Sequence, residues 1–223
     1  MPTLDRDGEV FLLNLGDTEN RFSPDWLTEV KAHLNTVESA DGPRVLVTTA
    51  SGKFFSNGLD LEWLSQHTDQ FAPYVIDVQD IFASVLALPV PTVCAIQGHC
   101  FAAGAMLALA HDFRVMRADR GFFCLPEVDI NIPFTRGMSA LIQGRLSKKT
   151  AHEAMTTGRR YGGGEALEAG IVDAVAHEDD VLSAAVEMAR PLAAKAGATL
   201  GIIKSRMYAD AFTALRDKEH PLD

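Results

Sequence analysis

The sequence lacks any hydrophobic run long enough to cross a membrane. Its longest apolar stretches are broken by Pro89, Pro91, Gln97 and Gly98, and its first residues show no basic start followed by an apolar segment. A membrane-spanning helix needs about 20 consecutive apolar residues, and a secretory signal needs a basic start and an apolar centre. We therefore expect no membrane association, and the abundant alanine and missing targeting signals favour the cytoplasm.

Cysteine is also scarce, with only Cys94, Cys100 and Cys124 in 223 residues. No two of them form a CxxC pair, and no histidine stands at a spacing that completes a zinc site. All three lie in apolar stretches, where a reduced, buried thiol is the common state. The sequence thus predicts neither a disulfide framework nor a metal, and no redox cofactor is implied.

Basic residues are in the minority. There are 20 Lys and Arg against 30 Asp and Glu, which gives a formal net charge of -10. Such a surface repels phosphate backbones, so nucleic acid is not an expected partner. A single small anionic ligand remains compatible with this charge, because a local group of donors can overcome the global field.

Strand and helix patterns alternate in the first two thirds of the chain. The predicted strands span residues 9–15, 44–49, 91–96, 113–116 and 121–124. The predicted helices span residues 24–37, 71–88, 102–110, 135–143, 147–157, 164–169, 180–194 and 199–215. Alternation favours an α/β fold with a parallel core sheet, followed by a more helical tail. We place the boundary near Gly144–Ser147, which gives an α/β core over 1–145 and a helical region over 146–223.

Two segments are suited to close backbone approach. In residues 54–60 (FFSNGLD), Gly58 permits a bend and Asp60 can cap the next helix. In residues 98–104 (GHCFAAG), a strand runs into a helix of small residues, whose first N–H groups are unpaired and suit an oxyanion. Taken alone, the first segment is more typical of an ordinary loop with a glycine, and the second of a helix packed tightly through alanines.

A third segment, residues 123–130 (FCLPEVDI), places Glu127 among apolar neighbours. A carboxyl group in apolar surroundings has a raised pKa, which suits a proton shuttle near neutral pH. The alternative is an exposed turn in which Glu127 and Asp129 are both solvated.

Taken together, the three segments resemble the crotonase family, also called the enoyl-CoA hydratase and isomerase superfamily. KFFSNGLDL is similar to the first oxyanion-hole motif of that family, IQGHCFAAGAMLALAHDFRV to the second, FCLPEVDINIP to the glutamate segment, and residues 158–173 to a late signature. The resemblance implies a spiral of repeated ββα units with a helical C-terminal trimerisation region, assembled as a homotrimer or a dimer of trimers. It also implies that the amides of Leu59 and Ala102 bind a thioester oxygen while Glu127 moves a proton.

The same resemblance implies an acyl thioester of coenzyme A as the ligand, with coenzyme A as part of the substrate and no separate cofactor. The substrate-binding candidates adjoin the two oxyanion motifs: Ser56, Asn57, Gly58, Leu59, Ala102 and Ala103. Arg21 and Lys53 are candidates for phosphate contacts, although each is more typical of a solvated surface charge.

One departure from the family pattern narrows the expected reaction. The hydratases of the family carry a second glutamate at the position that Met106 occupies here. A single carboxylate suits the isomerisation of 3-enoyl-CoA to 2-enoyl-CoA through a dienolate. The alternatives are a one-glutamate hydratase, another crotonase chemistry such as thioester hydrolysis or decarboxylation, and a catalytically silent acyl-CoA-binding paralogue.

Other polar residues fit structural roles better than catalytic ones. His99, between a strand and a helix, and His111, at a helix end, are typical of hydrogen-bonded structural histidines. Ser139 lacks the second glycine of a nucleophile elbow, so a serine hydrolase is not expected.

Overall fold

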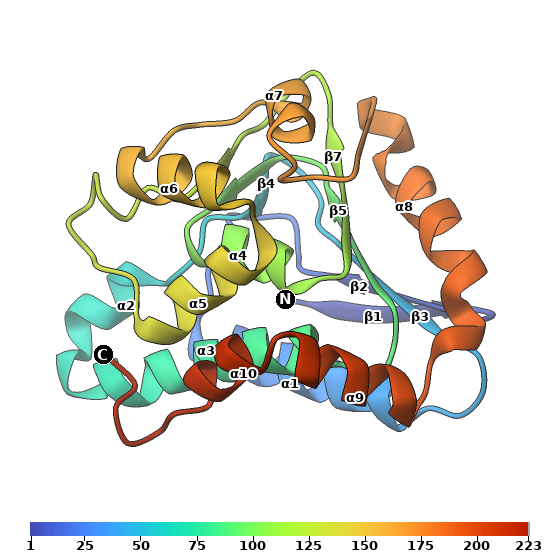
Figure 1. Ribbon diagram of the computed structural model, residues 1–223, viewed down its shortest axis with the longest axis horizontal. Coiled ribbons are helices and arrows are strands. Elements are labelled where there is room, and N and C mark those ends of the chain that lie inside the picture. Colours follow the sequence, from blue (N-terminus) through green and yellow to red (C-terminus); the bar gives the residue numbers. More distant parts are fainter. Residues whose placement is uncertain (223) are drawn as a thin grey trace.

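The computed structural model describes residues 1–222 and contains two sheets packed among helices (Figure 1). The larger sheet has six strands in the order β1-β2-β3-β5-β7-β9, antiparallel only between β1 and β2. Its strands are Thr3–Asp7 (β1), Val10–Asn14 (β2), Val45–Thr49 (β3), Thr92–Ile96 (β5), Phe113–Arg117 (β7) and Ala174–Ala176 (β9). The smaller sheet is parallel, in the order β4-β6-β8. Its strands are Phe54–Ser56 (β4), His99–Phe101 (β6) and Phe123–Cys124 (β8). The α/β prediction is confirmed.

Helices cover both sheets and make up most of the last third of the chain. The α-helices are Pro24–Ser39 (α1), Leu61–Gln66 (α2), Phe71–Leu86 (α3), Ala103–Ala110 (α4), Arg136–Arg145 (α5), Lys148–Thr157 (α6), Gly163–Glu168 (α7), Val181–Ala189 (α8), Ala198–Met207 (α9) and Ala209–Leu215 (α10). Short 3-10 turns lie at Thr68–Gln70, Glu178–Asp180 and Arg190–Lys195.

Helix α1 shows how local sequence sets these elements. The Ser23 side chain accepts a hydrogen bond from the Trp26 N–H at 3.3 Å, and Pro24 occupies the first turn, where its missing N–H costs nothing. The buried face then follows the helical period. Its residues are Trp26, Leu27, Val30, Leu34 and Val37, as the spacing predicts.

The larger sheet is buried on both faces, as expected for a mostly parallel sheet. Alternate residues of its central strands point to opposite sides. Val45, Val47 and Val93 pack on the side of α8 and of the 3-10 turn Arg190–Lys195 that follows it (Figure 1). Leu46 and Cys94 point to the other side, into the main core that α1, α3 and α4 complete.

The structure differs from the sequence prediction in several short elements. Strands β1 and β9 were not expected, and β4 lies in a segment predicted to be a loop. Strand β9 pairs with β7, so the region predicted to be helical also contributes a strand to the core sheet. The helix predicted over 199–215 is interrupted at Tyr208, and α10 packs against α5 and α3.

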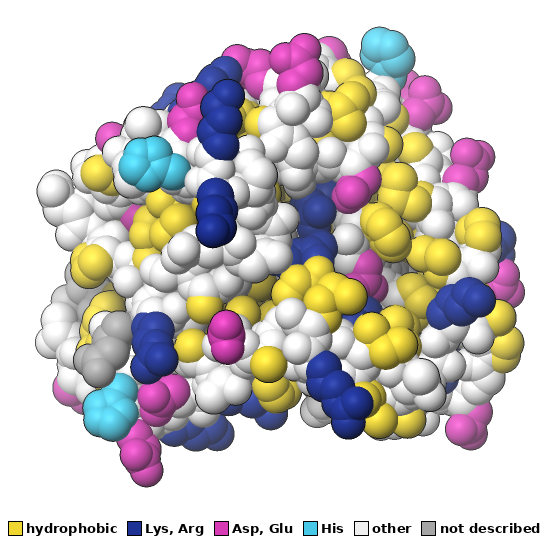
Figure 2. Space-filling view, viewed as in Figure 1, with side chains coloured by type: hydrophobic (Ala, Val, Ile, Leu, Met, Phe, Trp, Pro, Cys, Tyr) yellow, Lys and Arg dark blue, Asp and Glu magenta, His cyan; other side chains and the backbone are white. Residues whose placement is uncertain are grey.

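The surface mixes charges of both signs with apolar groups. Figure 2 shows hydrophobic side chains gathered over α8 and α9 on one face. Four large ones are exposed on these two helices: Leu182, Ile202, Ile203 and Met207. Within residues 1–222, no helix is both long and apolar enough to cross a bilayer.

Candidate active site

The three strands of the small sheet bring the three sequence motifs together. They run parallel, with Ser56 beside Cys100 and Phe101 beside Cys124. The segments that follow their carboxyl ends therefore emerge at one edge, the usual place for a ligand in a parallel sheet. Leu59, Ala103 and Glu127 all leave the sheet at this edge.

Two glycines set the distance between the first two motifs. A Cβ at Gly58 would lie 2.9 Å from the backbone nitrogen of Ala103, and a Cβ at Gly104 would lie 2.6 Å from the Cβ of Ser56. Gly58 also has φ +81°, which side chains disfavour. Both positions thus require glycine, and the two motifs pack backbone against backbone.

The backbone amides that are free to bind an oxyanion differ from the predicted pair at one position. The Ala102 N–H donates to the Cys124 carbonyl at 3.0 Å, because the β6–β8 ladder continues one residue past the strand. The assignment of Ala102 as an oxyanion donor is therefore wrong. Ala103, the first residue of α4, and Leu59 have no backbone acceptor among residues 1–222. These two amides, one of them at the positive end of a helix, are the available donors.

Ala102 has a different part in the site. It adopts φ 51° and ψ -124°, a region that residues other than glycine seldom occupy. This turn ends the strand and starts α4 in adjacent residues. Strain of this kind clusters at functional sites.

Glu127 is buried rather than solvated. The residue is only 6% exposed, and its Oε2 has no hydrogen-bond partner among residues 1–222. Burial raises the pKa of Glu127 from 4.5 to about 7. The turn after it holds its backbone, since the Ile132 N–H donates to the Glu127 carbonyl at 3.1 Å. The alternative of an exposed turn glutamate is wrong for Glu127, although Asp129 is exposed.

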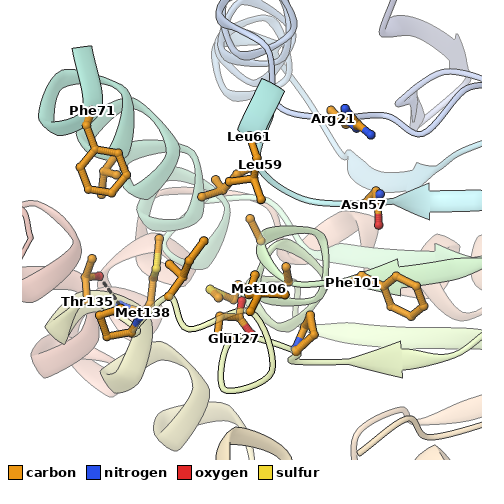
Figure 3. A pocket seen from close by; sticks show the side chains of 17 residues that line it. Arg21, Asn57, Leu59, Leu61, Phe71, Phe101, Met106, Glu127, Thr135 and Met138 are labelled. Atoms are coloured by element: carbon orange, nitrogen blue, oxygen red, sulfur yellow. Dashed lines mark hydrogen bonds between the residues drawn. The ribbon is translucent and has the colours of Figure 1, made fainter. Parts of the chain in front are cut away.

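A cavity of about 260 Å³ joins these groups (Figure 3). Its lining residues are Arg21, Asn57, Leu59, Leu61, Phe71, Val75, Phe101, Ala102, Ala103, Met106, Pro126, Glu127, Ile130, Ile132, Pro133, Thr135 and Met138. Figure 3 shows Arg21 and Asn57 toward one end and Phe71 and Met138 toward the other, with Glu127 between them. The cavity thus has one polar end and one apolar end.

Comparison with known proteins agrees with this geometry. The sequence profile described as enoyl-CoA hydratase/isomerase matches residues 6–220. The chain belongs to this family. It is 38% identical to the peroxisomal enoyl-CoA delta isomerase 2 of Arabidopsis thaliana, over 93% of this chain and 92% of that protein. It is 31% identical to a putative enoyl-CoA hydratase of Thermus thermophilus, over 94% of this chain and 85% of that one.

Solved structures of the family share the fold. An enoyl-CoA isomerase structure from Mycobacterium tuberculosis superposes with a TM-score of 0.87 at 27% identity, covering 97% of this chain and 95% of the other. A second structure of the same Mycobacterium tuberculosis protein, described as a probable enoyl-CoA hydratase, gives a TM-score of 0.89 at 27% identity, with 96% and 91% coverage. The predicted crotonase-like fold is thereby confirmed.

The predicted substrate-binding residues separate into two groups. Asn57, Leu59, Ala102 and Ala103 line the cavity, and Gly58 lies directly behind it. Ser56 does not reach the cavity. It is fully buried, and its hydroxyl donates to the Asn20 carbonyl at 2.8 Å and accepts from the Gly58 N–H at 3.0 Å. Its role is therefore to fix the Gly58 turn, and its assignment as a ligand contact is wrong.

The two candidate phosphate contacts also differ. Arg21 lines the polar end of the cavity and pairs with Glu19 at 2.6 Å. Lys53 does not line the cavity. Its Nζ lies 5.1 Å from the centre of the Phe54 ring.

His111 is hydrogen-bonded as predicted, whereas the buried Nδ1 of His99 has no hydrogen-bond partner among residues 1–222. In the buried His111, Nδ1 lies 2.9 Å from the Leu107 carbonyl and Nε2 lies 2.8 Å from the Thr48 hydroxyl. Burial lowers the pKa of His111 to about 3, so the ring is neutral. His99 packs against the rings of Phe54, Phe101 and Phe122, outside the cavity lining.

Several cavity residues were not predicted from the sequence. Phe71 and Val75 stand four residues apart on α3, and Thr135 and Met138 stand at the start of α5. Helical spacing shows that each pair shares a helix face. It does not show which face meets the cavity, since that depends on how α3 and α5 pack on α4.

Proposed function

We propose that this protein isomerises 3-enoyl-CoA to 2-enoyl-CoA, with Glu127 as the proton shuttle. The thioester oxygen accepts hydrogen bonds from the amides of Leu59 and Ala103. The coenzyme A arm leaves past Arg21 and Asn57, and the acyl chain extends toward the apolar end of the cavity. Coenzyme A is part of the substrate in this proposal, and no separate cofactor takes part.

The reaction balances with one carboxyl group. Ionised Glu127 removes a proton from C2, between the carbonyl and the double bond at C3. The electron pair spreads over C2 to C4 and the thioester oxygen, which becomes the oxyanion. Glu127 then returns the proton to C4, and the double bond lies between C2 and C3. Preorganised amide donors stabilise such an oxyanion, and the loss of one donor typically lowers kcat by about 10²- to 10³-fold.

The observation that carries this proposal is the buried carboxyl of Glu127, whose Oε2 has no hydrogen-bond partner among residues 1–222 and which lies in a mostly apolar cavity. Among the described residues that line the cavity, Glu127 is the only acid, and Met106 occupies the position of the second glutamate in the hydratases. A thioether cannot deprotonate water. The pKa of about 7 lets the same group take up and release a proton at neutral pH.

The relatives support the same reaction. Three Arabidopsis thaliana relatives, 32% to 38% identical to this chain, are named enoyl-CoA delta isomerases. Two of these names include the word peroxisomal, so they give no support to a cytoplasmic location for this chain.

One assay separates the candidate reactions. The protein is incubated with cis- and trans-3-enoyl-CoA and, separately, with 2-enoyl-CoA. The conjugated enoyl thioester is followed by its ultraviolet absorbance, and the products of hydration or hydrolysis are identified by mass. We expect conversion of the 3-enoyl substrates to conjugated 2-enoyl-CoA with no change in mass. Water addition to 2-enoyl-CoA as the faster reaction would identify a hydratase, and free thiol would identify a thioesterase. No exchange of the C2 proton in heavy water would identify a silent binding protein.

We also propose that the protein assembles as a homotrimer or a dimer of trimers through its C-terminal helices. The exposed apolar side chains of α9 support this assembly: Ile202 and Ile203 are each 50% exposed and Met207 is 65% exposed. Apolar groups gathered in this way mark interaction surfaces. Sedimentation equilibrium gives the test, with a trimer or hexamer mass expected and a monomer mass contrary to the proposal.

A further inference from the structure

The apolar end of the cavity opens to solvent through three large hydrophobic side chains. Leu61 is 45% exposed, Phe71 is 40% exposed and Ile130 is 44% exposed. They come from α2, the start of α3 and the turn that follows Glu127, and all three line the same cavity. We call these three residues the apolar rim. Single exposed apolar residues are common, but three from separate elements around one opening indicate a binding surface.

Beneath the rim the cavity is closed. Val75 and Met106 are each 2% exposed and Met138 is 6% exposed, so they form a packed floor. Thr135, which also lines this end, uses its hydroxyl to donate to the Gln79 Oε1 at 2.8 Å. The Gln79 amide nitrogen in turn donates to the Pro221 carbonyl at 3.0 Å. The floor is therefore fixed from behind by the C-terminal segment.

A closed floor and an open rim determine the path of a long chain. An acyl group whose carbonyl is held by Leu59 and Ala103 enters between Glu127 and Met106. Once it meets the floor, further carbons can continue only outward across the rim. Close-packed interiors do not make room for extra methylene groups without strain.

We propose that the apolar rim binds the distal carbons of long acyl chains, so that the protein acts preferentially on long, unbranched 3-enoyl-CoA. This inference rests on the proposed isomerase function and extends it to substrate class. The acyl chain is the expected ligand of the rim, because the rim residues and Glu127 line one continuous cavity. Each additional methylene of the acyl chain would raise kcat/KM by about fourfold if it were fully buried, and by about twofold if it contacted the half-exposed rim.

The test compares substrates and variants in a matrix. Values of kcat/KM are measured with hexenoyl, decenoyl and tetradecenoyl 3-enoyl-CoA for the wild type, for Phe71→Ser/Ile130→Ser, and for Leu167→Ser/Leu182→Ser. The last is the matched control, since it removes similarly exposed apolar groups from α7 and α8, outside the cavity lining and outside the proposed assembly surface on α9. Thermal unfolding of all three proteins establishes that the variants are folded.

We expect kcat/KM to rise with chain length in the wild type and in the control with Leu167→Ser and Leu182→Ser. In the rim variant, the tetradecenoyl-to-hexenoyl ratio of kcat/KM should fall by about tenfold or more. Equal losses at all lengths, or a changed sedimentation mass in the rim variant alone, would overturn the proposal. So would a wild type that turns over hexenoyl-CoA with no gain for longer chains. A wild type inactive on every 3-enoyl-CoA would instead reject the isomerase function itself.

Discussion

Gly58 passes so close to Ala103 that a Cβ there would lie 2.9 Å from the Ala103 backbone nitrogen. The two residues are 45 positions apart in sequence, yet they set the position of the two free amides at the site. Gly58 precedes Leu59, which supplies one amide, and Ala103 supplies the other. Any side chain at position 58 would thus cover one donor and displace the second.

Substitution of Gly58 should therefore damage catalysis more than stability. For Gly58→Ala, we expect kcat to fall by about 10²-fold or more, because the oxyanion loses well-placed donors. Gly8→Ala is the matched control, since Gly8 also has positive φ (+58°) but nothing lies within 4 Å of its added Cβ. Gly8→Ala should lose about 1 kcal/mol of stability from its positive φ. Gly58→Ala should lose more, because its Cβ also meets the Ala103 backbone, and only Gly58→Ala should lose activity. Equal activity in the two variants would reject this account of Gly58.

The pH dependence of turnover should follow the ionisation of Glu127. Its pKa is raised to about 7 by burial, and the base must be ionised to remove the C2 proton. The value of kcat/KM should therefore reach a plateau above pH 7 and fall about tenfold for each pH unit well below it. Steady-state kinetics across this range with a 3-enoyl-CoA give the measurement. A plateau that continues unchanged down to pH 5 would show that another group is the base.

The same raised pKa should make Glu127 a source of instability at high pH. A carboxyl whose folded-state pKa exceeds its unfolded value of 4.5 favours folding at low pH, and that contribution is lost as pH rises to about 7. Glu127→Gln removes the titration. Urea unfolding at pH 8 should show the variant more stable than the wild type by up to about 3 kcal/mol. The gain should shrink toward pH 4.5, and a gain that does not change with pH would contradict the assignment.

Met106 should be needed for packing and not for chemistry. Met106→Leu conserves volume at a buried position and should cost less than about 1.5 kcal/mol, with isomerase activity within a fewfold of the wild type. Met106→Glu would place a second carboxyl in the cavity. We expect it to lower stability and to introduce hydration of 2-enoyl-CoA, measured as 3-hydroxyacyl-CoA. Loss of isomerase activity in the leucine variant, once its folding is verified, would show that the thioether takes part in the reaction.

The motifs were the most predictable part of the molecule. The cap at Ser23, the buried face of α1 and the apolar surroundings of Glu127 follow from local chemistry that a short window of sequence contains. The three motifs also converge as predicted, because the parallel strands that carry them end at one edge.

The errors come from backbone pairing and packing over long range. Whether Ala102 or Ala103 has the free amide depends on how far β6 pairs with β8, and the residue types do not encode that length. The Ser56 side chain is buried outside the cavity lining, because Gly104 lets the two motifs approach closely at this point. Strand β9 is three residues long and only partly buried, so it has no alternation to detect, and it forms because β7 provides an edge.

The central claim is that one buried carboxyl moves the proton, and Glu127→Gln tests it most directly. The glutamine keeps the size of the side chain and removes its base. Turnover of trans-3-enoyl-CoA should fall by about 10³-fold or more, while acyl-CoA affinity measured by calorimetry stays within about threefold and Glu168→Gln, an exposed control, behaves as wild type. Retention of wild-type turnover in Glu127→Gln would contradict the account.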